Sequence, residues 1–348
     1  MIRRTRVAIV AGAAAVLLGG TLAFGVSAWA ARQQALAGPS DAQIAAAGSW
    51  AGEERLVFRN TAPGDGYGHV ASVPLGDPAG PRTVSADVCD RVDATGELLA
   101  CLRTVRGIVP QYTATVTSAD GAVDASWPLP GVPSRTRFSP DGSLVATTSF
   151  VTGHSYASMG FSTSTVIART DGQGTGADLG NLEEWTLLRG GTTVAPADRN
   201  YWGVTFADDD TFYATVGMNT AGTTALVRGD IRSRTLTTLA DNVECPSLSP
   251  DGSRVAFKRV TGGTLPAVHW TPAIYDITTG KIDVLPEERS IDDQIEWLDD
   301  DTLLYGMPRP DAPGDSDVWR LEVDGGAAPE IFIEHAWSPA VVADGTAG

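Results

Sequence analysis

The chain has 348 residues, of which 43% are hydrophobic and 19% are charged, with 39 glycines and 21 prolines. This composition excludes a disordered or collagen-like polymer, because such chains contain far fewer apolar residues or far more glycine and proline. The net charge of −17 argues against a nucleic-acid-binding protein, since binding to phosphates requires a basic face.

Residues 1–30 have the pattern of a secretory signal peptide. Three arginines, at positions 3, 4 and 6, precede an uncharged run rich in Ala, Val and Leu, and Ala28-Trp29-Ala30 forms a small-x-small cleavage site. The alternative is an uncleaved membrane anchor over residues 7–31, because about 20 apolar residues can span a bilayer. Both interpretations predict an extracytoplasmic protein that is secreted, periplasmic or associated with the cell envelope, with a linker over residues 31–48.

The cysteines are interpreted in the light of export, because an oxidising compartment preserves disulfides. Cys89 and Cys101 flank a short turn at residues 93–97. If Val92 faces Leu98 across this turn, antiparallel pairing also places Cys89 opposite Cys101, which predicts a cross-strand disulfide. Cys245 is left over, and we expect it to be a small core residue rather than a nucleophile.

The strongest signal in the chain is a repeated Ser-Pro-Asp-Gly sequence. Residues 139–146 read SPDGSLVA and residues 249–256 read SPDGSRVA. The proline presets φ, the aspartate caps the turn and the glycine supplies a positive φ, so each copy predicts a tight hairpin. Weaker copies place an acidic or glycine-containing turn before an apolar strand near Glu53, Thr95, Asp209 and Asp300.

The spacing of these copies predicts the fold. Equivalent apolar positions recur every 42 to 49 residues, with one interval of 68, at Val57, Leu99, Val145, Tyr213, Val255 and Leu304. These are the lengths of four-stranded propeller blades, and a second hairpin follows each copy. We therefore predict an all-β, six-bladed β-propeller over residues 49–342, followed by a tail at 343–348. The long interval predicts an enlarged outer hairpin in the third blade, over residues 171–184.

The ends of the repeat region predict how the ring closes. An apolar residue precedes the turn in five units, at Val92, Phe138, Phe206, Leu248 and Trp297, but the first unit has no such strand upstream. Residues 335–339, which read HAWSP, repeat the approach to a Ser-Pro turn. We therefore expect the C-terminal strand, with Trp337 in this apolar column, to pair beside residues 55–59 and close the ring.

The Ser-Pro-Asp-Gly repeats at 139–146 and 249–257 resemble those of TolB-like propellers, which are in turn similar to the propeller domains of dipeptidyl and prolyl peptidases. The resemblance covers residues 46–342 as a fold, with two of the six motifs strong. It implies an extracytoplasmic propeller, which in TolB itself belongs to an envelope complex that contacts a peptidoglycan-associated lipoprotein. TolB has a globular domain before its propeller, whereas here only residues 31–48 separate the predicted cleavage site from the first blade.

No catalytic motif is present in the sequence. We find no Gly-x-Ser-x-Gly elbow, His-Glu-x-x-His, phosphate-binding loop or EF-hand loop. The acidic runs at 208–210 and 299–301 fall at turns equivalent to Ser-Pro-Asp-Gly, so we expect them to cap turns rather than bind calcium. No cofactor is predicted.

The candidate binding residues are histidines, aromatics and one arginine. By the strand assignment they lie at or near the propeller face that carries the loops between successive blades; they are Tyr67, His69, His154, Tyr156, Arg199, Tyr201, Trp202, His269 and Trp270, with Asp198 and His335 nearby. Such aromatics stack on a sugar or anchor a partner peptide, and the alternative is that they pack between neighbouring loops.

These observations predict a monomeric, non-enzymatic binding or scaffold protein of the cell envelope. It would engage an envelope protein or a glycan through one face of the propeller, and would contact the membrane only if the N-terminal segment is uncleaved. The alternative is a metal-dependent lyase or hydrolase acting on envelope carbohydrate, which requires His69, His154 and His269 to converge on the central channel.

Overall fold

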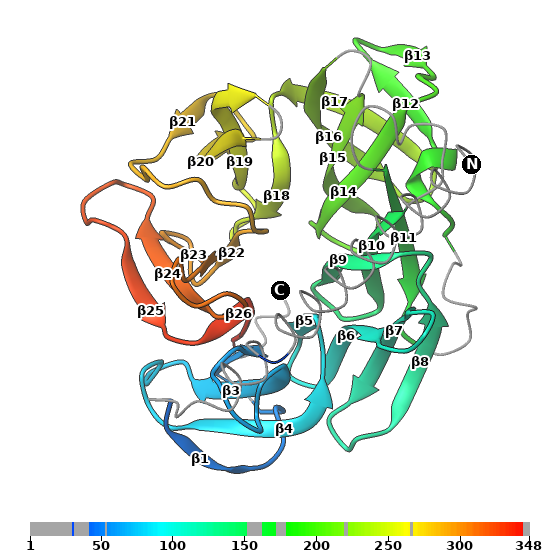
Figure 1. Ribbon diagram of the computed structural model, residues 1–348. Coiled ribbons are helices and arrows are strands. Elements are labelled where there is room, and N and C mark those ends of the chain that lie inside the picture. The colour runs from blue at the N-terminus through cyan, green and yellow to red at the C-terminus, as the bar shows by residue number, and fades with distance from the viewer. Residues whose placement is uncertain are drawn as a thin grey trace, which may run out of the picture.

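The fold is an all-β propeller of six radially arranged sheets, seen along its central axis in Figure 1. The computed structural model describes residues 30, 42–52, 54–151, 162–171, 179–218, 222–264 and 267–343. Each sheet is one blade, and the strands nearest the axis are β26, β5, β9, β14, β18 and β22. This arrangement confirms the six-bladed architecture expected from the repeat spacing.

The first three blades run anticlockwise from the bottom of Figure 1 to its right-hand side. Blade 1 consists of β1 (Ile44–Ala47), β2 (Arg55–Asn60), β3 (His69–Pro74), β4 (Arg82–Val88) and the last strand of the chain, β26 (Ala336–Val342). Blade 2 consists of β5 (Arg91–Ala94), β6 (Leu98–Val105), β7 (Gln111–Ser118) and β8 (Val123–Pro128). Blade 3 consists of β9 (Val132–Phe138), β10 (Leu144–Val151) and β11 (Ser162–Arg169).

The other three blades complete the ring. Blade 4 consists of β14 (Arg199–Phe206), β15 (Thr211–Met218), β16 (Thr223–Asp230), β17 (Thr235–Asp241), and the hairpin β12 (Thr186–Arg189) and β13 (Thr192–Val194). Blade 5 consists of β18 (Glu244–Leu248), β19 (Arg254–Thr264), β20 (Ala267–Asp276) and β21 (Ile282–Val284). Blade 6 consists of β22 (Glu296–Trp297), β23 (Thr302–Pro308), β24 (Ser316–Glu322) and β25 (Glu330–Ile333).

The Ser-Pro-Asp-Gly turns form the predicted hairpins through the same hydrogen bonds. Ser139 Oγ donates to Asp141 Oδ1 over 2.7 Å and accepts from Leu144 N over 2.9 Å, and Gly142 has φ 74°. The turn at 249–253 repeats every one of these bonds, with Gly252 at φ 71°. We call the face that carries these turns the hairpin face, and the opposite face, with the loops between blades, the loop face.

The ring closes as predicted. β26 pairs antiparallel with β2, from Arg55 opposite Val342 to Asn60 opposite Ala336. The C-terminal strand therefore supplies the innermost strand of the first blade (Figure 1). The expectation that Trp337 lies in the apolar column of the innermost strands is wrong, because Ala340 is the residue that pairs with Val57. In blade 2, likewise, Ala94 rather than Val92 pairs with Leu99.

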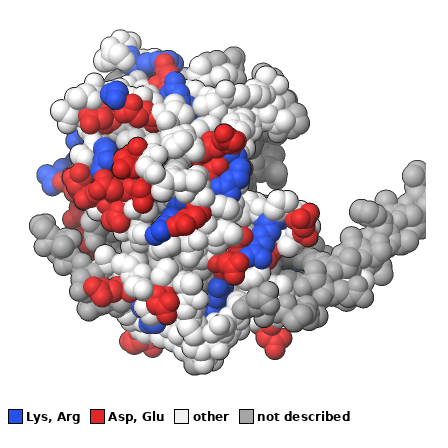
Figure 2. All heavy atoms as spheres, turned by 90° about the vertical axis from the view of Figure 1, so that its left-hand side faces the viewer, with Lys and Arg blue, Asp and Glu red and all other residues white. Residues whose placement is uncertain are grey.

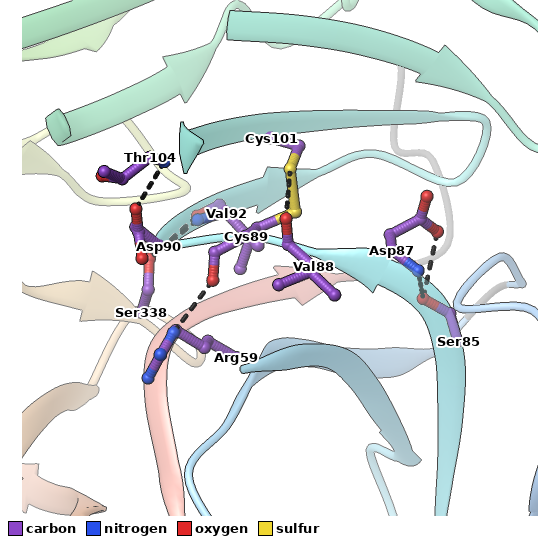
Figure 3. The surroundings of a disulfide bond; sticks show 10 residues. All are labelled: Arg59, Ser85, Asp87, Val88, Cys89, Asp90, Val92, Cys101, Thr104 and Ser338. Carbon is purple, nitrogen blue, oxygen red and sulfur yellow. Dashed lines mark hydrogen bonds between the residues drawn. A yellow bond between two sulfur atoms is a disulfide. The ribbon is translucent and has the colours of Figure 1, made fainter. Parts of the chain in front are cut away.

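The disulfide between Cys89 and Cys101 forms, with Cα atoms 5.4 Å apart, although the register that predicted it is wrong. The residue opposite Cys101 is Val92, and Cys89 lies just before β5. Figure 3 shows the disulfide at the corner between blades 1 and 2, where Arg59 Nε also donates to Cys89 O over 2.9 Å. The disulfide therefore links the segment that leads from blade 1 into blade 2 to β6, the second strand of blade 2.

Two further segments differ from expectation. Of the outer hairpin expected over residues 171–184, residues 172–178 lie outside the described part of the chain; in the part that is described, Asn181 bridges to Val166 and the chain then forms the 3₁₀ helix η1 (Leu182–Glu184). β12 then pairs parallel with β17 in blade 4. The segment expected as a linker contains β1, which pairs parallel with β4 at the outer edge of blade 1.

The membrane prediction falls outside the described part of the chain. Among the described residues, no helix is both long and apolar enough to span a bilayer. Residues 1–29, which carry the predicted signal peptide or anchor, are not among them.

Candidate functional site

The loop face holds most of the predicted binding residues, but they are not gathered into one site. His154 and Tyr156 lie outside the described residues. His69 begins β3 in blade 1, whereas His269 lies on β20 in blade 5. His69 Nδ1 lies 2.8 Å from Ser85 O in its own blade. Within the described ranges, no group of three or more His, Cys, Asp or Glu side chains is arranged to hold a metal ion.

His335 is part of a buried polar network between blades 6 and 1. Its Nδ1 lies 2.8 Å from Asp315 Oδ2, and its backbone N–H donates to Asp317 Oδ1 over 2.9 Å. Thr61 Oγ1 donates to Asp315 Oδ1 over 2.8 Å, which joins blade 1 to the same carboxylate. Arg309 Nη2 lies 2.7 Å from Asp317 Oδ1. These contacts explain His335 as a residue that fixes the seam.

Three of the predicted aromatics divide into one surface residue, Tyr67, and two core residues, Tyr201 and Trp202. Tyr67 is half-buried; its hydroxyl donates to Gly314 O in blade 6 over 2.9 Å, and Arg59 lies 4.9 Å above its ring. Tyr201 is fully buried in the apolar cluster between blades 3 and 4. Trp202 is 7% exposed, and its ring covers Gly217. Tyr201 and Trp202 therefore present no side-chain surface to a partner.

Arg199 holds the loop before β14 in place. Its Nε donates to Glu183 O over 3.1 Å and its Nη1 donates to Pro196 O over 2.9 Å. The guanidinium thus satisfies backbone carbonyls at η1 and in the loop, which is a structural role.

Trp270 lies beside a group of charges near the central axis. Lys258 Nζ is 4.8 Å from the centroid of the indole ring and 2.7 Å from Asp292 Oδ1. Arg135 Nη2, from blade 3, lies 4.0 Å from the same carboxylate oxygen. Burial acts to raise the pKa of Asp292, but the two cations outweigh it and hold the pKa below its usual range.

Cys245 is the free, buried cysteine next to these charges. Its φ is 50°, and its N–H donates to Thr215 Oγ1 over 2.9 Å. Burial acts to lower the pKa values of Arg135 and Lys258, but neighbouring negative charge that includes Asp292 outweighs it and raises both. Both cations therefore remain charged when the protein is folded.

Sequence reasoning missed the most exposed apolar residues of the loop face. The loop between β6 and β7 carries Ile108, which is fully exposed, and Val109, which is 75% exposed. Arg103 and Arg106 are also exposed there, and residues 98–119 contain no carboxylate. Figure 2 shows a contrasting surface, the side formed by blades 5 and 6, where carboxylates and cations are interspersed. The sequence signal was an isoleucine-valine pair that follows two arginines and a glycine in a loop.

The acidic runs at 208–210 and 299–301 cap turns, as expected. Asp208 Oδ1 accepts from Asp210 N over 2.8 Å and from Thr211 N over 2.7 Å. Asp299 Oδ1 accepts from Asp301 N over 2.9 Å. These carboxylates perform the turn-capping role that serine and aspartate share in the stronger repeats.

Comparison with known proteins identifies the fold of the chain but no family. No family model matches the chain, and no curated protein matches it. Among solved structures, TolB from Acinetobacter baumannii aligns with a TM-score of 0.56 at 16% identity, over 85% of this chain and 68% of that one. A puromycin-hydrolysing peptidase from Mycobacterium tuberculosis aligns with a TM-score of 0.50 at 14% identity, and this chain covers 47% of its length. An oligogalacturonate lyase in complex with manganese has a TM-score of 0.47 at 11% identity. The chain therefore shares the propeller fold of TolB, and the structures similar to it also include a peptidase.

Proposed function

We propose that the protein is an exported binding propeller of the cell envelope that docks a protein partner on its loop face. The observation that carries this proposal is the tip of the β6–β7 loop, where Ile108 and Val109 are exposed to solvent shortly after the exposed Arg103 and Arg106. Large apolar side chains that desolvate on contact, together with arginine, supply most of the affinity at protein interfaces.

The charge around this tip indicates the kind of partner. The whole chain has a net charge of −17, but the segment from Leu98 to Ala119 carries two arginines and no acidic residue. An acidic segment with an apolar side chain complements this tip and is repelled by most of the remaining surface. Such complementarity selects the docking position rather than supplying the affinity.

Export is supported by two independent features. The N-terminal sequence has the order of a cleaved signal, and the Cys89–Cys101 disulfide belongs to an oxidising compartment. N-terminal sequencing of the protein recovered from the envelope or culture medium tests this part. A chain that begins at residue 31 is expected, and a cytoplasmic chain that begins at Met1 would contradict it.

Site-specific photocrosslinking in cells tests the docking surface. A photoreactive residue at position 108 is expected to capture a defined partner, and the same residue at position 123 is not. Val123 is a matched control, because it is an exposed valine in the same blade at the opposite, hairpin face. Arg106→Glu should reduce the captured yield several-fold. Equal capture at both positions, or none at either, would overturn the proposed surface.

The metal-dependent alternative makes a different demand. It needs His69 and His269 to bind one ion, although they lie on blades 1 and 5 and His69 Nδ1 is engaged by Ser85 O. Stoichiometric metal in the purified protein, lost in a His69→Ala variant, would favour the enzyme.

A further inference from the structure

A groove lies between the outer parts of blades 5 and 6, on the left of Figure 1. One wall is the connector from β21 to β22, at residues 286–289. The other wall is Trp319 of β24 together with the loop before β25, at residues 325–329. The groove has a volume of about 530 Å³, which is within the range of pockets that hold specific ligands.

A buried carboxylate fixes the position of Arg289 in this groove. Glu287 is 5% exposed, and its carboxylate accepts from Arg289 Nε over 2.9 Å and from Nη2 over 2.5 Å. The Tyr305 hydroxyl donates to the same carboxylate over 2.5 Å. Burial acts to raise the pKa of Glu287, but these hydrogen bonds outweigh it and lower the pKa. The pair is therefore ionised, and the guanidinium is held with 36% of the Arg289 side chain exposed.

The fixed guanidinium covers one face of Trp319. Arg289 Cζ lies 3.7 Å from the centroid of the indole ring, and the ring also packs against the apolar cluster between blades 5 and 6. The indole N–H makes no hydrogen bond with another described residue, and Arg289 Nη1 has no carboxylate or carbonyl acceptor in the described ranges. The stack therefore offers two positioned donors and leaves little open aromatic face for a sugar ring.

The remaining lining of the groove is small and apolar. Ala327 and Ala328 are exposed in the loop before β25, and Pro286 is exposed on the facing connector. A Cβ placed on Gly325 would lie 3.5 Å from Pro286 Cγ, so the two walls meet at this end of the groove. Walls without long side chains allow the backbone of a ligand to approach closely.

The charge beside the groove is negative. Glu288 is exposed in the connector, and the Glu322 and Asp324 carboxylates lie within 3.5 Å of the position that a Cβ on Gly326 would occupy. Within the described ranges none of these three carboxylates forms an ion pair, whereas the charge of Arg289 is balanced by Glu287. A ligand with a cationic group is therefore favoured, and an anionic ligand is repelled.

We propose that this groove binds an extended, proline-rich segment of a protein partner that carries a lysine or an arginine. A polyproline II segment forms no internal hydrogen bonds, so its carbonyls accept from the indole N–H and from Arg289 Nη1. Its prolines pack against Ala327, Ala328 and Pro286, and its basic side chain lies near the three carboxylates. This site is separate from the β6–β7 loop, which selects an acidic partner.

A random peptide library displayed on phage, with peptides of about a dozen residues, tests the groove on the full folded chain. The baits are the wild type, Ala328→Trp, which fills the groove from an exposed loop, and Ala119→Trp as the matched control. Ala119 is likewise an exposed alanine after the third strand of a blade, in blade 2. Peptides retained by the wild type and by Ala119→Trp but not by Ala328→Trp are expected, and they should contain proline and a basic residue. No such peptides, or a set that is acidic or lacks proline, would overturn the proposal.

Fluorescence anisotropy with one selected, labelled peptide tests the individual contacts. The Kd should rise at least about tenfold in Ala328→Trp. It should rise several-fold in Trp319→Phe, which keeps an aromatic ring but removes the indole N–H. Glu288→Gln should weaken binding more at low than at high ionic strength, and Arg106→Glu, on the β6–β7 loop, should have no effect.

Two results of the anisotropy measurements would contradict the proposal. An unchanged Kd in both Ala328→Trp and Trp319→Phe would mean that the peptide binds elsewhere by general charge attraction, because neither substitution alters the net charge. Displacement of the peptide by an N-acetylglucosamine oligomer would mean that the groove holds a glycan.

Discussion

The seam between blades 6 and 1 and the seam between blades 3 and 4 both combine apolar packing with buried hydrogen bonds, but the bonded groups differ in charge. At the first, β26 enters blade 1, and a buried network joins the Asp315 carboxylate to His335 and Thr61. At the second, the described part of blade 3 has three strands, and Thr163 donates from its N–H to Asn200 Oδ1 and from its hydroxyl to Tyr201 O, both over 2.9 Å. An apolar cluster that includes Leu182, Trp185 and Leu187 packs around Tyr201. The closing seam thus depends on bonds to a carboxylate, and the other depends on neutral hydrogen bonds and apolar burial.

The difference between the two seams follows from how each one is connected along the chain. A seam made by a terminal strand must specify a single register, because a slip by one residue would expose the buried face of β26. Hydrogen bonds to one buried carboxylate provide that specificity. A seam within the continuous chain is already held by its connections, so apolar packing and hydrogen bonds between neutral groups are sufficient there.

Removal of the closing strand β26 is expected to destabilise the protein more than any of the substitutions below. Deletion of residues 331–348 removes β26 together with most of β25, and leaves the inner edge of blade 1 unpaired. We expect no cooperative unfolding transition by circular dichroism. A melt as sharp and as high as that of the full chain would show that the ring does not depend on this strand.

The polar network at the closing seam should be sensitive to one substitution. Asp315→Ala leaves His335 and the Thr61 hydroxyl without their shared buried carboxylate, and we expect the free energy of unfolding to fall by about 3–4 kcal/mol. Urea titration measures the change. A loss below about 1 kcal/mol would mean that the network is dispensable and that strand pairing alone closes the ring.

The apolar cluster at the seam between blades 3 and 4 should lose stability when a cavity is introduced into it. Leu187 is 1% exposed in the cluster between blades 3 and 4, and Leu187→Ala is expected to lower the free energy of unfolding by about 2–3 kcal/mol. Leu239, which is 40% exposed on β17, is the matched control. Similar effects of the two substitutions would contradict the packing role of the β12 hairpin.

A turn that lies outside both seams provides a control whose contribution to stability depends on pH. Hydrogen bonds from Ser249 and Ser253 lower the pKa of Asp251 from 3.8 to about 2. Because the folded pKa is depressed, the stabilisation is present above pH 3.8 and is lost as the pH falls through about 2. Asp251 is exposed, so Asp251→Asn should cost no more than about 1 kcal/mol at neutral pH. The difference between variant and wild type in urea should shrink towards pH 2, and a constant difference would contradict this assignment.

The smallest effect is expected at an exposed ion pair that links β12 to β17. Arg189 Nη2 lies 3.2 Å from Asp241 Oδ1, and both side chains are largely in solvent. Asp241→Asn should change the free energy of unfolding by at most about 0.5 kcal/mol. A loss comparable to that of Asp315→Ala would remove the distinction between the two seams.

The sequence predicted the features that depend on local turn chemistry. The repeats at 139–146 and 249–256 specified their hairpins, and the spacing of the copies led to six blades and to closure by the C-terminal strand. Registers were less predictable: the Cys89–Cys101 pairing was correct, but Val92 rather than Cys89 lies opposite Cys101. The error arose because the turn was placed without knowing which residues pair at its base.

The features that depend on contacts distant in sequence could not be predicted. Nothing local to residues 186–189 indicates that β12 pairs parallel with β17. The convergence of Arg91, Arg135 and Arg137 also depends on how β5 of blade 2 packs against β9 of blade 3. The binding residues chosen for aromatic character included Tyr201 and Trp202, which are buried, because strand position does not show which side of a blade faces its neighbour.

The two edges of blade 1 have a mechanical consequence. Force applied at residue 42 would load β1, which has three residue pairings with β4 at the outer rim, and would strip it without opening the ring. Force applied at residue 343 would load β26, which has five pairings with β2 at the axis. Rupture there separates blade 6 from blade 1. Tension on the N-terminal side would therefore detach only β1, whereas tension on the C-terminal side would open the ring.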